Sequence, residues 1–159
     1  MNLSFSTRGW LDVSWEENIQ TALDMRFGGI EVYNIHKTPA LTDRGGPFHK
    51  YNTAATVRQL REKKLSIPVF DTSCDISSED CLDDVRDIMQ IAHNMQVPYV
   101  CVVALCDNDE RIRGALRVLI PDAERLGLTI LLKTSGVFSD TARLRALLDD
   151  FACDQLAAL

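Results

Sequence analysis

Charged and hydroxyl side chains follow directly after five short apolar stretches that have the character of β-strands. Among them, Lys133, Glu31 and Asp71 can move a proton or hold a charge. Amines and carboxylates serve as general acids and bases. Because parallel α/β sheets bind ligands at the carboxyl ends of their strands, these three residues are the predicted catalytic set. Substrate contacts are expected from Arg8, Tyr33, His36, Ser73 and Ser135.

Lys133 has three interpretations that the sequence leaves open. It can be a salt-bridged lysine at a strand end, with Glu31 or Asp71 as its partner. It can bind a phosphate or carboxylate group, or it can be the Schiff-base nucleophile of a lyase, which needs an acid–base group beside it. Of the two functional interpretations, we favour the anion site.

Residues 71–75 form the densest polar segment after an apolar stretch. Its carboxylates can transfer protons, but capping and turn formation explain such a run equally well. Cys74 lies beside two acids that disfavour a thiolate, so we do not expect it to act as a nucleophile. His36 and His49 lie 13 positions apart without a defined Cys or Asp partner. This spacing does not predict a metal site.

Short apolar stretches alternate with amphipathic segments about every 30 residues, which is the pattern of successive β-α units. The strands are expected to start at about residues 3, 30, 67, 99, 128 and 155. Helices are expected over residues 15–27, 53–64, 79–95, 112–126 and 139–151.

Three local signals refine this pattern. Ser14 and Glu17 form a capping box at the start of the first helix, and Ser139 is the expected cap of the last. Pro121 should kink or divide the fourth helix near Ile120, because proline lacks a backbone donor. The segment from Asn34 to Tyr51 is longer than usual for an α/β connection, which predicts a functional or mobile loop.

The length limits the architecture. A complete eight-stranded barrel takes about 250 residues, whereas this chain has 159. We therefore predict an α/β fold that is a partial (β/α) TIM barrel, with about six parallel strands and five intervening helices joined by right-handed crossovers. Residues 1–159 are expected to form a single domain.

Net charge and cysteine content indicate which classes of partner and which cellular compartment to expect. A net charge of −6 opposes attraction to nucleic acid or an anionic membrane surface, so neither is expected as a partner. Five cysteines without a C-x-x-C pair are typical of reduced thiols in a cytoplasmic protein. The sequence shows no signal peptide and no run of 18 apolar residues. Cytoplasmic localisation is the expectation.

Three segments carry a family resemblance: Gly29-Ile30-Glu31-Val32-Tyr33, residues 123–132, and residues 134–141. On these segments the chain resembles the sugar phosphate isomerase/epimerase family, the xylose-isomerase-like barrels that also include the family-two apurinic endonucleases. The resemblance covers the whole chain and implies the N-terminal portion of such a barrel, strands 1 to 6.

The resemblance implies a Mg²⁺ or Mn²⁺ site in full-length members, held by a Glu after strand five and by Asp, His and Glu from strands six to eight. Lys133 stands at the position of that first Glu. An ammonium group has no lone pair for a hard cation, so we predict no metal ligand and no cofactor in this chain. Glu31 matches a strand-two carboxylate that can orient a sugar hydroxyl.

The resulting expectation is a sugar phosphate isomerase/epimerase-like protein of carbohydrate metabolism that binds a small sugar-type substrate and is inactive as this chain alone. One alternative is a non-catalytic barrel fragment or binding module, completed by self-association or by a complementary barrel half. Six strands of a barrel leave two edges unpaired, which natural proteins normally cover. A Schiff-base lyase that uses Lys133 is the second alternative.

Overall fold

The computed structural model describes residues 3–78 and 81–159, which include a curved sheet of six parallel strands. The strands pair in sequential order from the first to the sixth. This confirms the predicted barrel-like order and excludes a doubly wound sheet. The strands are β1 (Ser4–Ser6), β2 (Gly29–Tyr33), β3 (Val69–Asp75), β4 (Tyr99–Val103), β5 (Thr129–Leu132) and β6 (Leu156–Ala158).

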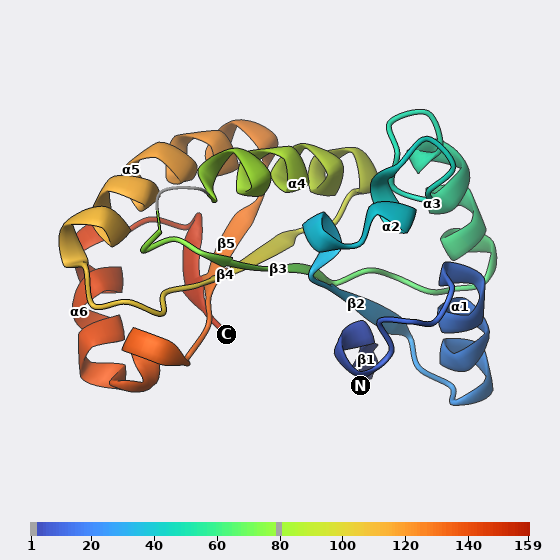
Figure 1. Ribbon diagram of the computed structural model, residues 1–159, viewed down its shortest axis with the longest axis horizontal. Helices are drawn as coiled ribbons and strands as arrows, with labels where there is room; N and C mark the ends of the chain where they lie inside the picture. The colour runs from blue at the N-terminus through green and yellow to red at the C-terminus, as the bar shows by residue number, and fades with distance from the viewer. Residues whose placement is uncertain (1–2, 79–80) are drawn as a thin grey trace.

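Five helices connect successive strands, as predicted. Figure 1 shows them as an outer arc around the strands, with both chain ends on the open side of the arc. The chain therefore has an α/β, partial-barrel architecture. The connecting helices are α1 (Trp15–Asp24), α3 (Thr53–Glu62), α4 (Leu82–Met95), α5 (Asp109–Leu126) and α6 (Thr141–Phe151). Shorter pieces are η1 (Thr7–Gly9), η2 (Ile35–Lys37), α2 (Pro39–Thr42) and η3 (Gly136–Ser139).

The outer face of the sheet packs on the helices and forms the main core. Alternate strand residues such as Ile30 and Val100 are fully buried there. Phe48, from the long connection after β2, inserts between Trp15 and Phe70. Its ring centroid lies 5.0 Å from that of Trp15 and 5.3 Å from that of Phe70. Burying an aromatic side chain stabilises the fold by about 1.5–3 kcal/mol. The connection expected to be functional or mobile is thus anchored at Phe48.

The inner face has a different character. Val69, Cys101 and Leu131 form a small second apolar cluster, with Ala157 packed against it. These residues lie on four neighbouring strands, from β3 to β6, and the register pairs Cys101 with Leu131 and Leu131 with Ala157. Such layers of inward-facing side chains fill the interior of β/α barrels.

The expected division of one helix and the expected cap of another were wrong. Helix α5 runs unbroken through Pro121, so the expected division does not occur. Proline removes only one backbone donor, and the buried residues Leu119 and Ala123 hold the turns on either side. Helix α6 is capped by Asp140, whose carboxylate accepts from the backbone N–H of Ala142 at 3.0 Å, and Ser139 belongs to the preceding η3. The expected start of the third helix at residue 79 lies outside the described residues.

Strand β3 also differs from its prediction over residues 67–70. It begins at Val69 and continues through the polar segment to Asp75, so these side chains lie within the strand and not after it. Ser73 adopts a left-handed conformation with φ of 52°. The pairing with β4 shifts between Asp71 and Asp75, which lets an irregular polar segment remain in the sheet.

The capping box at Ser14 and Glu17 is present as predicted.

Among the described residues, no helix combines the length and apolar character needed to cross a membrane.

Candidate functional site

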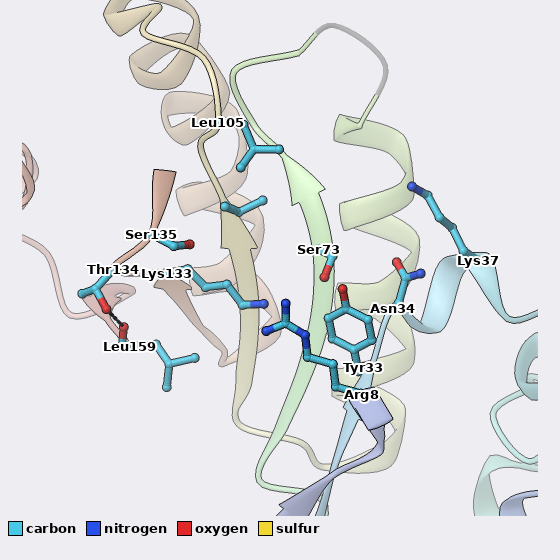
Figure 2. Close-up of a pocket in the computed structure, with 11 residues that line it drawn as sticks. Arg8, Tyr33, Asn34, Lys37, Ser73, Leu105, Lys133, Thr134, Ser135 and Leu159 are labelled. Carbon is cyan, nitrogen blue, oxygen red and sulfur yellow. Dashed lines mark hydrogen bonds between the residues drawn. The ribbon is translucent and has the colours of Figure 1, made fainter. Parts of the chain in front are cut away.

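A cavity of about 560 Å³ opens at the carboxyl ends of the strands (Figure 2). Its lining comes from η1, from the ends of β2 to β4, and from the segments that follow β5 and β6. This is the position that the parallel strand order predicts for a ligand site. The lining residues are Arg8, Tyr33, Asn34, Lys37, Ser73, Val103, Leu105, Lys133, Thr134, Ser135 and Leu159.

Two cations converge on one aromatic ring in this cavity. The Arg8 guanidinium carbon lies 5.3 Å and the Lys133 Nζ 5.4 Å from the ring centroid of Tyr33. Figure 2 shows the Lys133 side chain extending toward that ring, and the Arg8 guanidinium, in this view, between the end of Lys133 and the ring. Contact with the ring face stabilises a cation but leaves its hydrogen-bond donors free. Within residues 3–78 and 81–159, the Arg8 side chain has no ion pair or hydrogen bond, so its donors can serve a ligand.

Lys133 forms a buried ion pair with Asp71. Its ammonium donates a hydrogen bond to Asp71 Oδ2, while Oδ1 accepts from the backbone N–H of Ser73 at 3.0 Å. The side chain of Asp71 is only 3% exposed and that of Lys133 is 20% exposed. The salt-bridged interpretation of Lys133 is confirmed, with Asp71 as the partner. Glu31 instead accepts from the Ser6 hydroxyl at 2.7 Å.

This pair bears on the two functional interpretations of Lys133. An ammonium shared with a buried carboxylate is not the free amine that attacks a carbonyl, so the arrangement disfavours a Schiff base. A protonated amine that lines a cavity suits an anionic ligand group.

The divalent metal site that the barrel fold implies does not fit these residues. Lys133 stands where the first metal ligand is expected, and it occupies one oxygen of Asp71. A fixed ammonium group repels a divalent cation, and hard cations need oxygen ligands with free lone pairs.

Most of the predicted site residues meet at the cavity. Arg8, Tyr33, Ser73, Lys133 and Ser135 line it. Asp71 lies beneath it through its contact with Lys133, and Glu31 is held on β2 by Ser6. Three polar lining residues were not predicted, although each lies within four positions of a strand end, which is the same signal. They are Asn34, Lys37 and Thr134.

His36 differs from its predicted place, because it is not among the lining residues. Its ring nitrogens lie 3.8 and 3.9 Å from the Cys74 sulfur. Burial lowers the pKa of His36 below its ordinary value. Burial also raises the pKa of the Cys74 thiol, with smaller contributions from Asp84 and Asp71. The expectation that the Cys74 thiolate is disfavoured is confirmed, but burial is its main cause.

Asp75 has a structural role. Its Oδ1 accepts from the backbone N–H groups of Ser77 and Leu105, each at 3.0 Å. These bonds connect the end of β3 to the segment after β4. Of the two interpretations of the polar segment, turn formation applies to Asp75.

Several solved structures have a fold similar to that of this chain. A xylose isomerase domain protein from Planctomyces limnophilus has a TM-score of 0.71 and 12% identity, over 98% of this chain and 59% of that one. The chain has the xylose-isomerase-like fold. The IolI protein with a bound zinc atom (TM-score 0.77, 15% identity) and a D-tagatose 3-epimerase-like protein (0.72, 13%) are also similar.

These similarities cover 98% of this chain but 61% and 63% of the IolI and epimerase-like chains. The chain thus spans about 60% of the length of these xylose-isomerase-like structures. No protein-family model and no curated protein sequence matches it.

Proposed function

We propose that this chain binds a small, hydroxylated, sugar-type anion at the carboxyl ends of its strands. The observation that carries the proposal is the charge of the side chains that line the cavity: Arg8, Lys37 and Lys133 are among them, and no aspartate or glutamate of the described residues is. The nearest acids, Asp71 and Glu31, are already bound to Lys133 and Ser6. The lining therefore favours a phosphate or carboxylate group, even though the whole chain carries a net charge of −6.

Polar groups in the same cavity support the hydroxylated part of the ligand. Asn34 Oδ1 is buried and has no hydrogen-bond partner among the described residues. An unsatisfied buried acceptor costs about 1–3 kcal/mol, and a ligand hydroxyl that donates to it removes this cost. Ser73 and Ser135 add hydroxyl groups to the lining, and Tyr33 adds an aromatic surface.

The related folds favour chemistry beside a sugar carbonyl. In such a reaction the Lys133 ammonium stabilises negative charge that develops on a substrate oxygen. Asp71 cannot act freely as the base, because its oxygens bind Lys133 and the Ser73 backbone. We therefore expect this chain alone to bind its ligand without catalysing isomerisation or epimerisation.

Calorimetry with three probes tests this proposal. Ribose 5-phosphate should bind at least about tenfold more tightly than ribose or inorganic phosphate, because only it offers both charge and hydroxyl groups. Arg8→Met and Lys37→Met should each weaken binding of the sugar phosphate. Arg58→Met, which removes an exposed cation from α3, is the matched control and should have no effect. Equal binding of ribose and ribose 5-phosphate would contradict the proposal.

A second proposal concerns association. Among the described residues, strands β1 and β6 each pair on one side only, and the small apolar cluster of Val69, Cys101 and Leu131 lies on the inner face. Unpaired strand edges bind further strands. We expect a second copy of this chain, or a complementary barrel half, to cover them.

Light scattering at micromolar concentration tests this association. The purified chain should be larger than a monomer, and Ala158→Pro in β6 should weaken the assembly, because proline cannot donate to a strand ladder. A uniform monomer whose stability is indifferent to this proline would exclude β6 as the contact.

A further inference from the structure

Three side chains with metal-binding atoms meet outside the strand-end cavity. They are His36 on η2, Cys74 on β3 and Asp84 in the first turn of α4. One atom of each lies within 4.8 Å of the corresponding atoms of the other two. None of the three lines the strand-end cavity, so the cluster has no part in the proposed anion site.

The fold fixes the position of this cluster. Cys74 alternates along β3 with Ser73, which lines the cavity, so its side chain faces the helix layer and joins the main core. Its backbone N–H donates to Thr72 Oγ1 at 3.0 Å, which holds this part of the strand. His36 is half-buried and Asp84 is exposed, so the cluster extends from the core to the surface.

We propose that His36, Cys74 and Asp84 form a Zn²⁺ site with three protein ligands and a fourth position open to solvent. Imidazole nitrogen, thiolate sulfur and carboxylate oxygen are the ligand types that zinc takes in proteins. A thiolate favours zinc over Mg²⁺ or Mn²⁺, which prefer oxygen ligands alone. The site is distinct from the metal position that the barrel fold implies, because its ligands come from η2, β3 and α4.

The three ligand atoms lie within 4.8 Å of one another, so small side-chain rotations bring them to tetrahedral coordination. Bonds of about 2.0–2.3 Å place two ligand atoms about 3.3–3.8 Å apart. The Cys74 sulfur lies 3.8 Å from His36 Nε2 and 3.9 Å from Nδ1, so the sulfur lies beside the ring, and the imidazole must rotate to direct one nitrogen at an ion bound to the sulfur. Asp84 needs a small side-chain rotation, which its exposure permits.

The charges also balance. When zinc binds, the S–H bond of Cys74 breaks, an S–Zn bond forms, and the proton leaves to solvent without any change of oxidation state. Thiolate and carboxylate then neutralise the two charges of the ion. Lys37 is the nearby cation that acts on both His36 and Cys74, and it reduces the negative charge of the cluster without reversing it.

Cobalt is the probe for the test, because Co²⁺ replaces Zn²⁺ in such sites and is coloured. The full chain, freed of metal with a chelator, should bind one Co²⁺ with a near-ultraviolet thiolate-to-cobalt band and the intense visible bands of tetrahedral geometry. One equivalent of Zn²⁺ should remove these bands. A competing chromophoric chelator then gives the zinc affinity.

Matched variants separate this site from adventitious binding. Cys74→Ser should abolish the thiolate band, and His36→Gln and Asp84→Asn should each weaken zinc binding by about tenfold or more. Cys81→Ser, His49→Gln and Asp83→Asn change the same residue types outside the cluster and should leave binding unchanged. Cys81 is a suitable control because its thiol donates to the Asp75 carbonyl oxygen at 3.1 Å.

Circular dichroism establishes that each variant is folded, and the exposed Asp84 gives a variant that does not disturb the core. A chain that shows no thiolate band would overturn the proposal, since the Cys74 thiol then only contacts the His36 ring. Zinc affinity that the three ligand variants leave unchanged would overturn it as well.

Discussion

The two ends of the strands carry cavities of similar size but different chemistry. The cavity at the carboxyl ends has a volume of about 560 Å³, and one at the amino ends, before β4 and β5, has about 500 Å³. Three cations and several hydroxyl groups line the first. The second has no lysine, arginine, aspartate or glutamate in its lining. Volume alone does not distinguish a binding site from a gap between turns, whereas side-chain chemistry does.

The amino-end residues have a structural role. His93 Nδ1 lies 2.8 Å from the Leu126 carbonyl oxygen and so connects α4 to the end of α5. Gln96 and Gly127 end the two helices in left-handed conformations. At the carboxyl ends, by contrast, the fold retains a buried ion pair whose desolvation is costly. This pair lies beside the cation-lined cavity, whereas no lysine, arginine, aspartate or glutamate lines the cavity at the amino ends.

The largest expected effect comes from Lys133→Met at the carboxyl end. This change leaves the Asp71 carboxylate buried without its partner, which should lower the free energy of unfolding by about 3 kcal/mol. It should also weaken ribose 5-phosphate binding by about tenfold or more, because a lining cation is lost. Urea unfolding and calorimetry measure the two effects.

A double variant separates stability from binding. Asp71→Asn with Lys133→Met removes both charges, so it should recover most of the lost stability but none of the lost binding. Recovery of binding in this double variant would show that Lys133 serves the fold and not the ligand.

A pair of glycines compares the two ends directly. Gly136 and Gly127 both have positive φ angles, of 60° and 67°. An added Cβ at Gly136 would lie 2.3 Å from the Ala104 carbonyl oxygen, whereas at Gly127 nothing lies within 4 Å. Gly127→Ala should therefore cost only the backbone strain, about 1–2 kcal/mol.

Gly136→Ala should cost about 2–3 kcal/mol, because the loop must also move away from β4. It should weaken sugar phosphate binding by displacing Thr134 and Ser135, while Gly127→Ala leaves binding unchanged. Thermal unfolding and calorimetry check both variants. Equal losses of stability would mean that the close contact at Gly136 is absent in solution.

The smallest expected effect comes from the N-terminus of α1, which lies outside the cavity lining. Ser14→Ala removes the cap and should cost about 1 kcal/mol without changing ligand binding. Hydrogen bonds from the Ser14 hydroxyl and backbone hold the pKa of Glu17 below its ordinary value of 4.5. A lowered carboxyl pKa gives stability that is present above pH 4.5 and lost as the pH falls through the lowered pKa.

The wild type should therefore lose this contribution on acidification, and Ser14→Ala should lose less, because only its backbone N–H still donates to Glu17. Urea unfolding of both proteins between neutral pH and pH 3 measures the difference. A constant difference in stability across that range would exclude the Glu17 contribution.

Local patterns predicted the fold well where one sequence signal decides the outcome. The capping box at Ser14 and the strand order followed from the residues alone. The path of β3 did not, because a polar segment stays in the sheet only through the left-handed Ser73 and a register shift against β4. The expected division of α5 at Pro121 does not occur, because packing of the flanking turns outweighs the loss of one helix hydrogen bond.

In the candidate site, too, local sequence predicted some features, whereas others depend on packing between distant segments. Arg8, Tyr33 and Lys133 were predictable because each lies at or just after a strand. The contact of His36 with Cys74 and Asp84 was not, because its members are far apart in sequence and only the packing of η2 and α4 against β3 brings them together. Lys133 had two candidate partners, and only the structure selects Asp71 over Glu31.

The most direct test of the central claim is a chemical-shift map of the nitrogen-15-labelled chain titrated with ribose 5-phosphate. Saturable shifts should concentrate in the backbone amides of the carboxyl-end lining, above all at Asn34, Ser73 and Ser135, and ribose should produce much weaker ones. Saturable shifts centred on His93 and Gly127 at the opposite end, or no saturable shifts at all, would contradict the account.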